Sequence, residues 1–265
     1  MEPPDWYYLG PDSALATPSK VSVGGNLYYV SLVNKVKPMN KILYVFLFMA
    51  LVAFVSCTTD SDDGEDWDAA KVCPETGTNA YGMPNRGTFT DVRDGQVYKY
   101  TTIGKQVWMA QNLRYKASYS ECYDVLGDSC ETLGRYYLFV EGGKLTFELQ
   151  KIDVSLFETV CPEGWHVPSN EEWTDLIEIM GNKVATRLKG NRFWGGYNDL
   201  GTDDCSFDAL PAGTVGYTAA ISIFNNATFV SRTLKSEDSH SVVGIGESVT
   251  FSDSNVKHSI RCIKD

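Results

Sequence analysis

The stretch CPEGWHVPSNEEWTDLIEIM, residues 161–180, decides the fold because it contains a complete set of helix signals. Ser169 is a favourable N-cap, and Glu172 three residues later completes a capping box. Gly181 can adopt the positive φ that ends a helix. Four apolar residues recur at the i, i+3, i+4, i+7 spacing of one helix face, namely Trp173, Leu176, Ile177 and Met180. The sequence therefore predicts one main helix over about residues 169–181, with this face packed on a core.

β-Branched and aromatic residues dominate the chain on both sides of this helix. Residues 88–115 contain two turn signals, Asp94-Gly95 and Gly104-Lys105, between runs that suit a half-buried sheet. A second, short helix is predicted over residues 184–188, and residues 191–216 are rich in loop-forming residues. Strand-like runs close the chain at residues 227–232, 242–245, 249–251 and 258–263. The order of these elements predicts an α+β domain.

An apolar run near the N-terminus has the length of an export signal. Fourteen consecutive apolar residues, from Ile42 to Val55, follow Met39-Asn40-Lys41. A membrane span needs about 20 such residues, whereas the core of a signal peptide has about 7 to 15. The run ends in Ser56-Cys57 and resembles a bacterial lipoprotein signal in which Cys57 carries the lipid. We therefore predict a lipid-anchored protein of the bacterial cell envelope, at the outer membrane or cell surface.

This interpretation also predicts the domain boundaries. Residues 39–57 are the signal peptide, and residues 1–38 are an over-extended N-terminus; the alternative is a genuine cytoplasmic segment ahead of a signal anchor. Residues 58–86 are predicted to be a tether, since they begin with an acidic segment that contains no basic residue until Lys71 and should stay solvated. A sorting signal for the cell surface is the alternative for that segment. The folded domain then covers residues 87–265.

Charge and cysteine usage narrow the classes of partner. The net charge of −11 argues against nucleic acid, which requires a basic surface. Apart from Cys57, six cysteines remain: Cys73, Cys122, Cys130, Cys161, Cys205 and Cys262. The chain has no C-x-x-C pair, so its cysteines lack the spacing that zinc ligands usually have. An even number of cysteines in an exported chain predicts disulfides, with 15 possible connectivities.

Several separate blocks resemble the Fibrobacter succinogenes major paralogous domain. In chain order they are DVRDGQVYKYTTIGKQVWMAQNLRY, GRYYLF, CPEGWHVPSNEEW, TRLKG, FDALPAG and HSIRCIKD, from about Asp91 to Asp265. The resemblance implies an exported, often lipid-anchored bacterial protein whose biochemical role is unassigned. Two positions depart from the family pattern. The segment ATFVS at residues 227–231 lacks the usual tryptophan before the serine, and Cys205 is not a typical family position.

The motif Pro168-x-x-x-Glu172-Trp173 also resembles the sulfatase-modifying-factor domain, which shares a compact α+β fold with the C-type lectins. The resemblance implies a C-type-lectin-like fold with a twisted antiparallel sheet and long loops. Its terminal strands would be neighbours, with Val107 near Arg261, and a disulfide would join Cys161 to Cys262. A short local loop is then expected between Cys122 and Cys130, and elimination leaves Cys73 with Cys205.

Candidate binding residues lie in the loop region after the helix. Trp194 and Tyr197 could form a platform that stacks on sugar rings, although local packing explains them equally well. Asp199, Asp203 and Asp204 could supply oxygen ligands to Ca²⁺, and C-type lectins use this loop for calcium. The lectin motifs Glu-Pro-Asn and Trp-Asn-Asp are absent, so no cofactor is predicted and calcium is the alternative.

The sequence contains little that indicates catalysis. His166 could act as a general base, but the sequence identifies no orienting carboxylate or nucleophile for it. An enzyme of the formylglycine-generating type needs a pair of reactive late cysteines, and Cys205 and Cys262 are far apart. We therefore expect a non-catalytic module that binds a carbohydrate or another envelope component. A structural or adhesion protein without a dedicated ligand is the alternative, and an enzyme comes third.

Overall fold

The computed structural model describes residues 19–23, 26–30, 67–123, 129–144, 146, 150–195, 200–216 and 220–265, and it divides into two units, residues 1–62 and 63–265. In the first unit, β1 (Ser19–Val23) and β2 (Asn26–Val30) form an antiparallel hairpin. This hairpin is not among the predicted elements, although two β-rich runs around Gly24-Gly25 are a hairpin signal. The predicted signal peptide and Cys57 lie outside the described residues.

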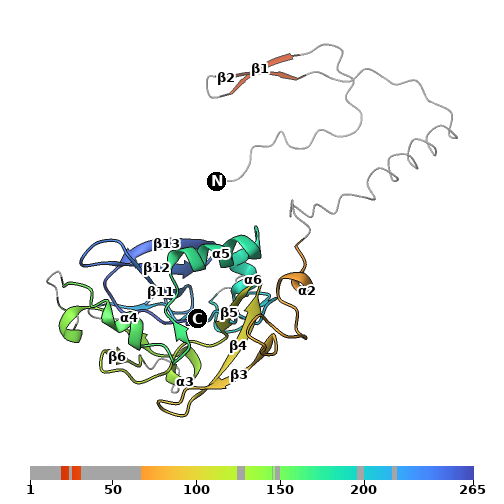
Figure 1. Ribbon diagram of the computed structural model, residues 1–265. Coiled ribbons are helices and arrows are strands. Elements are labelled where there is room, and N and C mark those ends of the chain that lie inside the picture. The colour runs from red at the N-terminus through yellow and green to blue at the C-terminus, as the bar shows by residue number, and fades with distance from the viewer. Residues whose placement is uncertain are drawn as a thin grey trace. The chain divides into compact units, whose positions relative to one another are not determined.

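The larger unit is built on a five-stranded antiparallel sheet in the order β3-β4-β5-β14-β8. Because β14 pairs with both β5 and β8, the C-terminal end of the chain lies inside this sheet (Figure 1). Its strands are β3 (Arg86–Thr90), β4 (Val97–Ile103), β5 (Gln106–Met109), β8 (Trp165–His166) and β14 (Ile263–Lys264).

The two predicted turns of this sheet have different outcomes. Gly104-Lys105 is confirmed as a two-residue turn, since Ile103 pairs with Gln106 and Gly104 has a φ of 58°. The two-residue turn at Asp94-Gly95 is wrong, because β3 ends at Thr90 and β4 begins at Val97. The longer loop is held by the Asp91 carboxylate, which accepts a hydrogen bond from the backbone N–H of Arg93.

The expected pairing of strands near the two ends of the domain is present, but its register differs. Ile263 lies opposite Trp108, and the backbone N–H of Met109 donates to the carbonyl of Cys262. Arg261 therefore contacts the carbonyl of Met109 instead of lying beside Val107. Side chains alternate between faces along a strand, so the register decides which core each one enters.

A second sheet contains the later strands in the order β11-β12-β13. They are β11 (Ala227–Leu234), β12 (His240–Ile245) and β13 (Val249–Ser254), and all three were predicted in outline. The predicted strand over residues 258–263 is largely wrong, because β14 has only two residues. His258 and Ser259 instead form isolated bridges with Tyr137 and Phe229, respectively.

Two further pairs of short strands lie outside these sheets. They are β6 (Ser120–Glu121) with β7 (Tyr136–Tyr137), and β9 (Thr214–Val215) with β10 (Ala220–Ile221).

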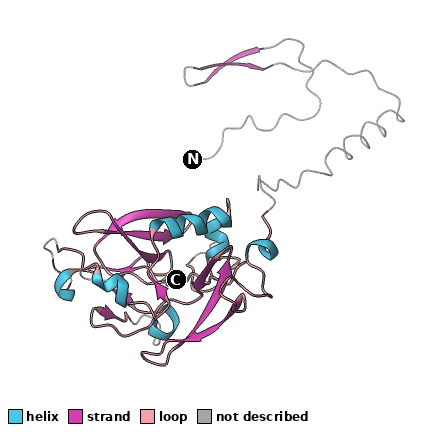
Figure 2. Ribbon diagram, in the orientation of Figure 1, coloured by secondary structure: helices cyan, strands magenta, loops and turns pink. Residues whose placement is uncertain are grey.

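Helix α5 (Asn170–Met180) forms where the sequence signals place it. Ser169 is the N-cap, the capping box with Glu172 is complete, and Gly181 follows the helix with a φ of 68°. Short helices and strands joined by long loops surround it (Figure 2). The other described helices are α2 (Ala69–Val72), α3 (Ser129–Leu133), η2 (Glu141–Gly143), α4 (Ser155–Thr159) and α6 (Val184–Leu188), the last as predicted. No helix in the described part of the chain has the length and apolar character needed to span a membrane.

Strand β5 separates two core clusters because its side chains alternate between the faces of the sheet. Val107 and Met109 belong to one cluster, together with Tyr98, Tyr137, Phe139, Phe157, Trp165, Cys161 and Cys262. Trp108 belongs to the other cluster, together with Trp173, Leu176, Met180, Phe207, Phe229, Cys73 and Cys205. Here α5 packs on the sheet, and the rings of Trp108 and Trp173 lie 4.6 Å apart.

Three disulfides join these parts of the domain. The bonded pairs are Cys161–Cys262, Cys122–Cys130 and Cys73–Cys205, the same pairs that we expected. The bond of Cys73 also shows that the folded unit begins earlier than residue 87. Trp67 donates a hydrogen bond from its indole nitrogen to the carbonyl of Ile179, and Cys73 is buried. Residues 67–86 therefore pack on the domain, and an extended tether over them is wrong.

Candidate functional site

Trp194 does not present an open face for stacking. It is 8% exposed and belongs to the same core cluster as Trp173 and Trp108. The Lys189 ammonium lies 4.8 Å from the centre of its ring. The loop folds back here, since the N–H of the next residue, Gly195, donates to the carbonyl of Phe224. The proposed sugar platform at Trp194 is therefore wrong, and Tyr197 lies outside the described residues.

The predicted calcium ligands are held by separate protein partners. The Asp203 carboxylate accepts a hydrogen bond from the N–H of Asp208 at 2.7 Å, whereas the Asp204 carboxylate lies 3.8 Å from the guanidinium of Arg187. Burial raises the pKa of Asp203 to about 6. Within the described ranges, no group of three or more His, Cys, Asp or Glu side chains is placed to hold a metal ion. Asp199 lies outside these ranges.

His166 has two carboxylate partners that the sequence did not reveal. Its Nε2 lies 2.8 Å from Glu172, and its Nδ1 lies 2.6 Å from Asp265 at the C-terminus. The hydrogen bond with Glu172 raises the pKa of His166, burial opposes this shift, and the bond with Asp265 adds to it. Because each ring nitrogen is already hydrogen-bonded to a carboxylate, neither is free to accept a proton from a substrate. The arrangement joins the start of α5 to the last residue and does not form a general base.

We predict that the His166→Gln variant loses more stability at pH 5.5 than at pH 8.5. The folded pKa of His166 is raised, so its contribution is complete below the unfolded pKa of about 6.5 and is lost as the pH rises through the folded pKa. Urea unfolding should show a loss of about 1–2 kcal/mol at the lower pH. The Asp265→Asn variant should show the same pH dependence. An equal loss at both pH values would contradict this account.

The other two histidines are buried structural residues. His258 accepts a hydrogen bond from the Ser254 hydroxyl at Nε2 and donates from Nδ1 to Thr228, which in turn donates to the carbonyl of Gly213. Burial, with a smaller contribution from nearby His240, lowers the pKa of His258 to about 3. An imidazole with this pKa takes a proton from a serine very poorly. The Ser254–His258 pair therefore lacks the properties of an activated nucleophile.

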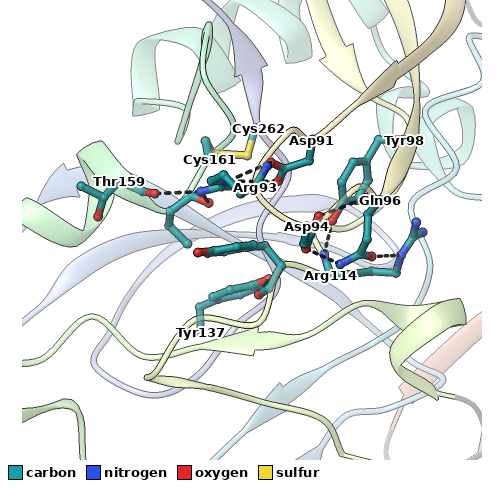
Figure 3. Close-up of polar contacts among 12 residues, drawn as sticks. Asp91, Arg93, Asp94, Gln96, Tyr98, Arg114, Tyr137, Thr159, Cys161 and Cys262 are labelled. Carbon is teal, nitrogen blue, oxygen red and sulfur yellow. Dashed lines mark hydrogen bonds and ion pairs between the residues drawn. A yellow bond between two sulfur atoms is a disulfide. The ribbon is translucent and has the colours of Figure 1, made fainter.

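Arg93 ties the β3–β4 loop to the C-terminal end of α4. It forms a bidentate ion pair with the buried Asp91 carboxylate and donates to the carbonyls of Thr159 and Val160. Figure 3 shows these contacts beside the disulfide of Cys161. A bidentate pair between an arginine and a buried carboxylate stabilises a local arrangement. Arg93 is therefore a structural link.

A polar pocket of about 140 Å³ is a candidate binding site. It lies where the segment after β5, helix α3, the loop after α6, residues 208–210 and the segment before β14 come together. Leu210 is the one apolar side chain among the residues that line it. The others are Gln111, Asn112, Arg114, Glu131, Thr132, Arg192, Asp208 and Arg261.

Arg261 forms the buried floor of this pocket. Its five N–H donors are used by the Asn112 side chain and by the carbonyls of Met109, Phe207 and Asp208. No carboxylate among the described residues forms an ion pair with it, and burial lowers its pKa to about 10. Its guanidinium also lies 4.6 Å from the centre of the Phe207 ring. The pocket therefore has a fixed positive charge beneath it.

Two more arginines lie at the pocket with donors still available. Arg114 donates to Gln96 and to the carbonyl of Val97, as Figure 3 shows in part, and Glu131 is 3.5 Å away. Arg192 is 51% exposed and uses Nη2 in a 2.6 Å contact with Asp208. No hydrogen bond within the described part of the chain engages Nη1 of either arginine.

None of the pocket residues was predicted as a site residue. They come from distant segments, and no local motif marks them. The available signal was that three blocks with family resemblance, QNLRY, FDALPAG and HSIRCIKD, contribute Arg114, Asp208 and Arg261 to the same place.

Comparison with known proteins identifies the family of this chain. The model of the Fibrobacter succinogenes major domain matches residues 101–264, which include β5, α5, β14 and the pocket. Searches of curated proteins and of solved structures found no match. Because the family model matches more than half of the sequence, the chain belongs to the Fibrobacter succinogenes major domain family.

Proposed function

We propose that this chain is a lipid-anchored protein of the bacterial cell envelope whose folded domain binds a carbohydrate or another envelope component without catalysis. The observation that carries this proposal is the polar pocket above Arg261, which offers hydrogen-bond donors and acceptors in one concave site. The histidines support it, since the ring nitrogens of His166 and His258 are engaged by other residues of the chain.

Two features support export. Disulfides persist in oxidising compartments, and this domain contains three of them. The apolar run that ends before Cys57 has the length of a signal-peptide core. The acidic segment after Cys57 would then keep the domain away from an anionic membrane surface.

The location has a direct test. We predict that the wild-type chain partitions with membranes and begins at a lipid-modified Cys57, because one diacylated cysteine supplies two acyl chains for stable anchoring. The Cys57→Ser variant should lose the lipid and should not be processed at this position. Mass spectrometry of the mature N-terminus checks both outcomes, with Cys122→Ser as a matched control. A mature N-terminus upstream of Met39 would contradict the proposal.

The alternatives differ in what they require of the domain. A structural or adhesion protein needs no occupied pocket, and it predicts that pocket variants change no binding. An enzyme of the formylglycine-generating type needs two reactive late cysteines, whereas Cys205 and Cys262 are each bonded to another cysteine. We also propose that the domain is a variant of the C-type-lectin-like fold. The neighbouring strands β5 and β14 and the Cys161–Cys262 bond support this assignment.

A glycan array tests the proposed binding. The fragment from residue 58 to 265 contains the whole larger unit, and it would be applied with and without calcium. Retention of one glycan class under either condition is the expected result. If no glycan is retained, carbohydrate binding is excluded, and retention only with calcium would point back to Asp199, Asp203 and Asp204.

A further inference from the structure

We infer that the pocket above Arg261 binds a single acidic sugar residue, a hexuronate, through its carboxylate and ring hydroxyls. This inference rests on the proposed binding function and adds the class of ligand. The volume is the first argument. A cavity of about 150 Å³ holds one benzene ring, and this pocket has about 140 Å³. It therefore has room for no more than one sugar ring.

The charges favour a ligand with one negative charge. Three arginines line the pocket against two carboxylates, those of Asp208 and Glu131, which leaves one positive charge in excess. Arg261 has no ion-pair partner among the described residues, and burial lowers its pKa to about 10. An anion bound nearby would favour the charged form of Arg261 and offset this effect of burial. A doubly charged phosphate would exceed this excess and meet the two carboxylates. A monoanion matches it.

The available donors suit a carboxylate. A guanidinium presents its N–H groups as a planar fork that matches the two oxygens of a carboxylate. Arg192 is half exposed and is held through Nη2 by Asp208, which orients the rest of its fork. Arg114 is held through Nε by the Gln96 side chain and through Nη2 by the carbonyl of Val97. Both side chains are thus positioned before a ligand arrives.

The remaining polar groups suit sugar hydroxyls. The Gln111 amide oxygen accepts a hydrogen bond from the N–H of Lys99, which fixes the amide. The Thr132 hydroxyl and the Asp208 carboxylate lie in the same lining, so donors and acceptors are both present. Leu210 adds one apolar surface for the C–H face of a pyranose. A simple anion such as acetate would use the arginines and leave these groups without a partner.

Isothermal titration of the full-length protein in detergent tests the inference. The probes are galacturonate and glucuronate, the matching neutral hexoses, and acetate and inorganic phosphate. We expect a hexuronate to bind at least about tenfold more tightly than its neutral hexose or acetate, because only the hexuronate satisfies both sets of groups. The Arg192→Gln variant should weaken this binding by about tenfold or more. Thr132→Val, which removes no charge, should weaken it less, and Arg232→Gln, outside the pocket, should leave it unchanged.

Each other outcome overturns a defined statement. If a neutral hexose binds as tightly as the hexuronate and Arg192→Gln weakens both, the inferred charge of the ligand is wrong and the binding function stands. If acetate or phosphate binds as tightly, the pocket is a simple anion site and the sugar class is wrong. If Arg192→Gln and Thr132→Val leave hexuronate binding intact, the pocket is not the site. If no titrated sugar binds while the array retains glycans, only this inference fails. If no titrated sugar binds and the array retains no glycan, the proposed carbohydrate binding fails as well.

Discussion

Replacement of Arg261 with methionine should lower the free energy of unfolding by about 3–5 kcal/mol, because several buried acceptors would lose their hydrogen-bond donor at once. Methionine fills part of the volume but donates no hydrogen bond. The side-chain oxygen of Asn112 and the carbonyls of Met109, Phe207 and Asp208 would lose their donor. Each buried acceptor left without a partner costs about 1–3 kcal/mol unless water enters. Urea unfolding followed by tryptophan fluorescence measures the loss.

Two further variants show whether the geometry or the charge of Arg261 matters. Arg261→Lys keeps the positive charge but has three donors in place of five, so it should lose stability by a smaller amount than Arg261→Met. Arg192→Met removes an arginine from the same pocket, but its ion pair is half exposed, so the loss should be below about 1 kcal/mol. If Arg261→Met is as stable as Arg192→Met, the network does not hold the floor of the pocket.

The parts of the fold that the sequence predicts well are those with local causes. Helix α5 follows from the Ser169 cap, the Glu172 capping box and the apolar face, all within one segment. The turn at Gly104 follows from a residue that adopts positive φ at no cost. Such signals act over a few residues, so tertiary packing does not need to be known.

The errors involve contacts between distant segments. Trp194 looks like a surface aromatic in a glycine-rich loop, but the loop folds back and buries its ring in the α5 core cluster. Residues 67–86 look like the end of a tether, but the indole of Trp67 and the disulfide of Cys73 hold them on the domain. The register of β5 against β14 is likewise decided by core packing on both faces.

The candidate site was missed for the same physical reason. Arg114, Asp208 and Arg261 are separated along the chain and meet only when the β14 strand enters the sheet beside β5. The sequence identifies no orienting carboxylate for His166, yet Glu172 and Asp265 both contact it after folding. The sequence shows the identity of such groups, and the topology decides which of them converge.

Joint replacement of Cys161 and Cys262 with alanine should be the other severe change. This disulfide joins residues 101 positions apart and lies within a core cluster. It connects the segment before α5 to the residue that precedes β14. The chain-entropy model gives about 4.7 kcal/mol for a closed loop of this length, and native disulfides typically contribute about 2–5 kcal/mol. Loss of the bond also removes the link beside Arg93 that Figure 3 shows. We expect a loss of unfolding free energy near the upper end of that range.

Joint replacement of Cys122 and Cys130 with alanine is the matched control, because it also removes one disulfide. Its loop spans 8 positions, for which the same model gives about 2.5 kcal/mol, and Cys122 is exposed. Chemical unfolding of both double variants under non-reducing conditions measures their free energies of unfolding. The control should be more stable than the Cys161/Cys262 variant by about 2 kcal/mol. Hydrogen exchange of the β14 amides should accelerate in the Cys161/Cys262 variant alone, because of the two disulfides only Cys161–Cys262 lies next to this strand. Equal losses in the two variants, with β14 still protected, would show that the β5–β14–β8 pairing holds the C-terminal strand without the disulfide.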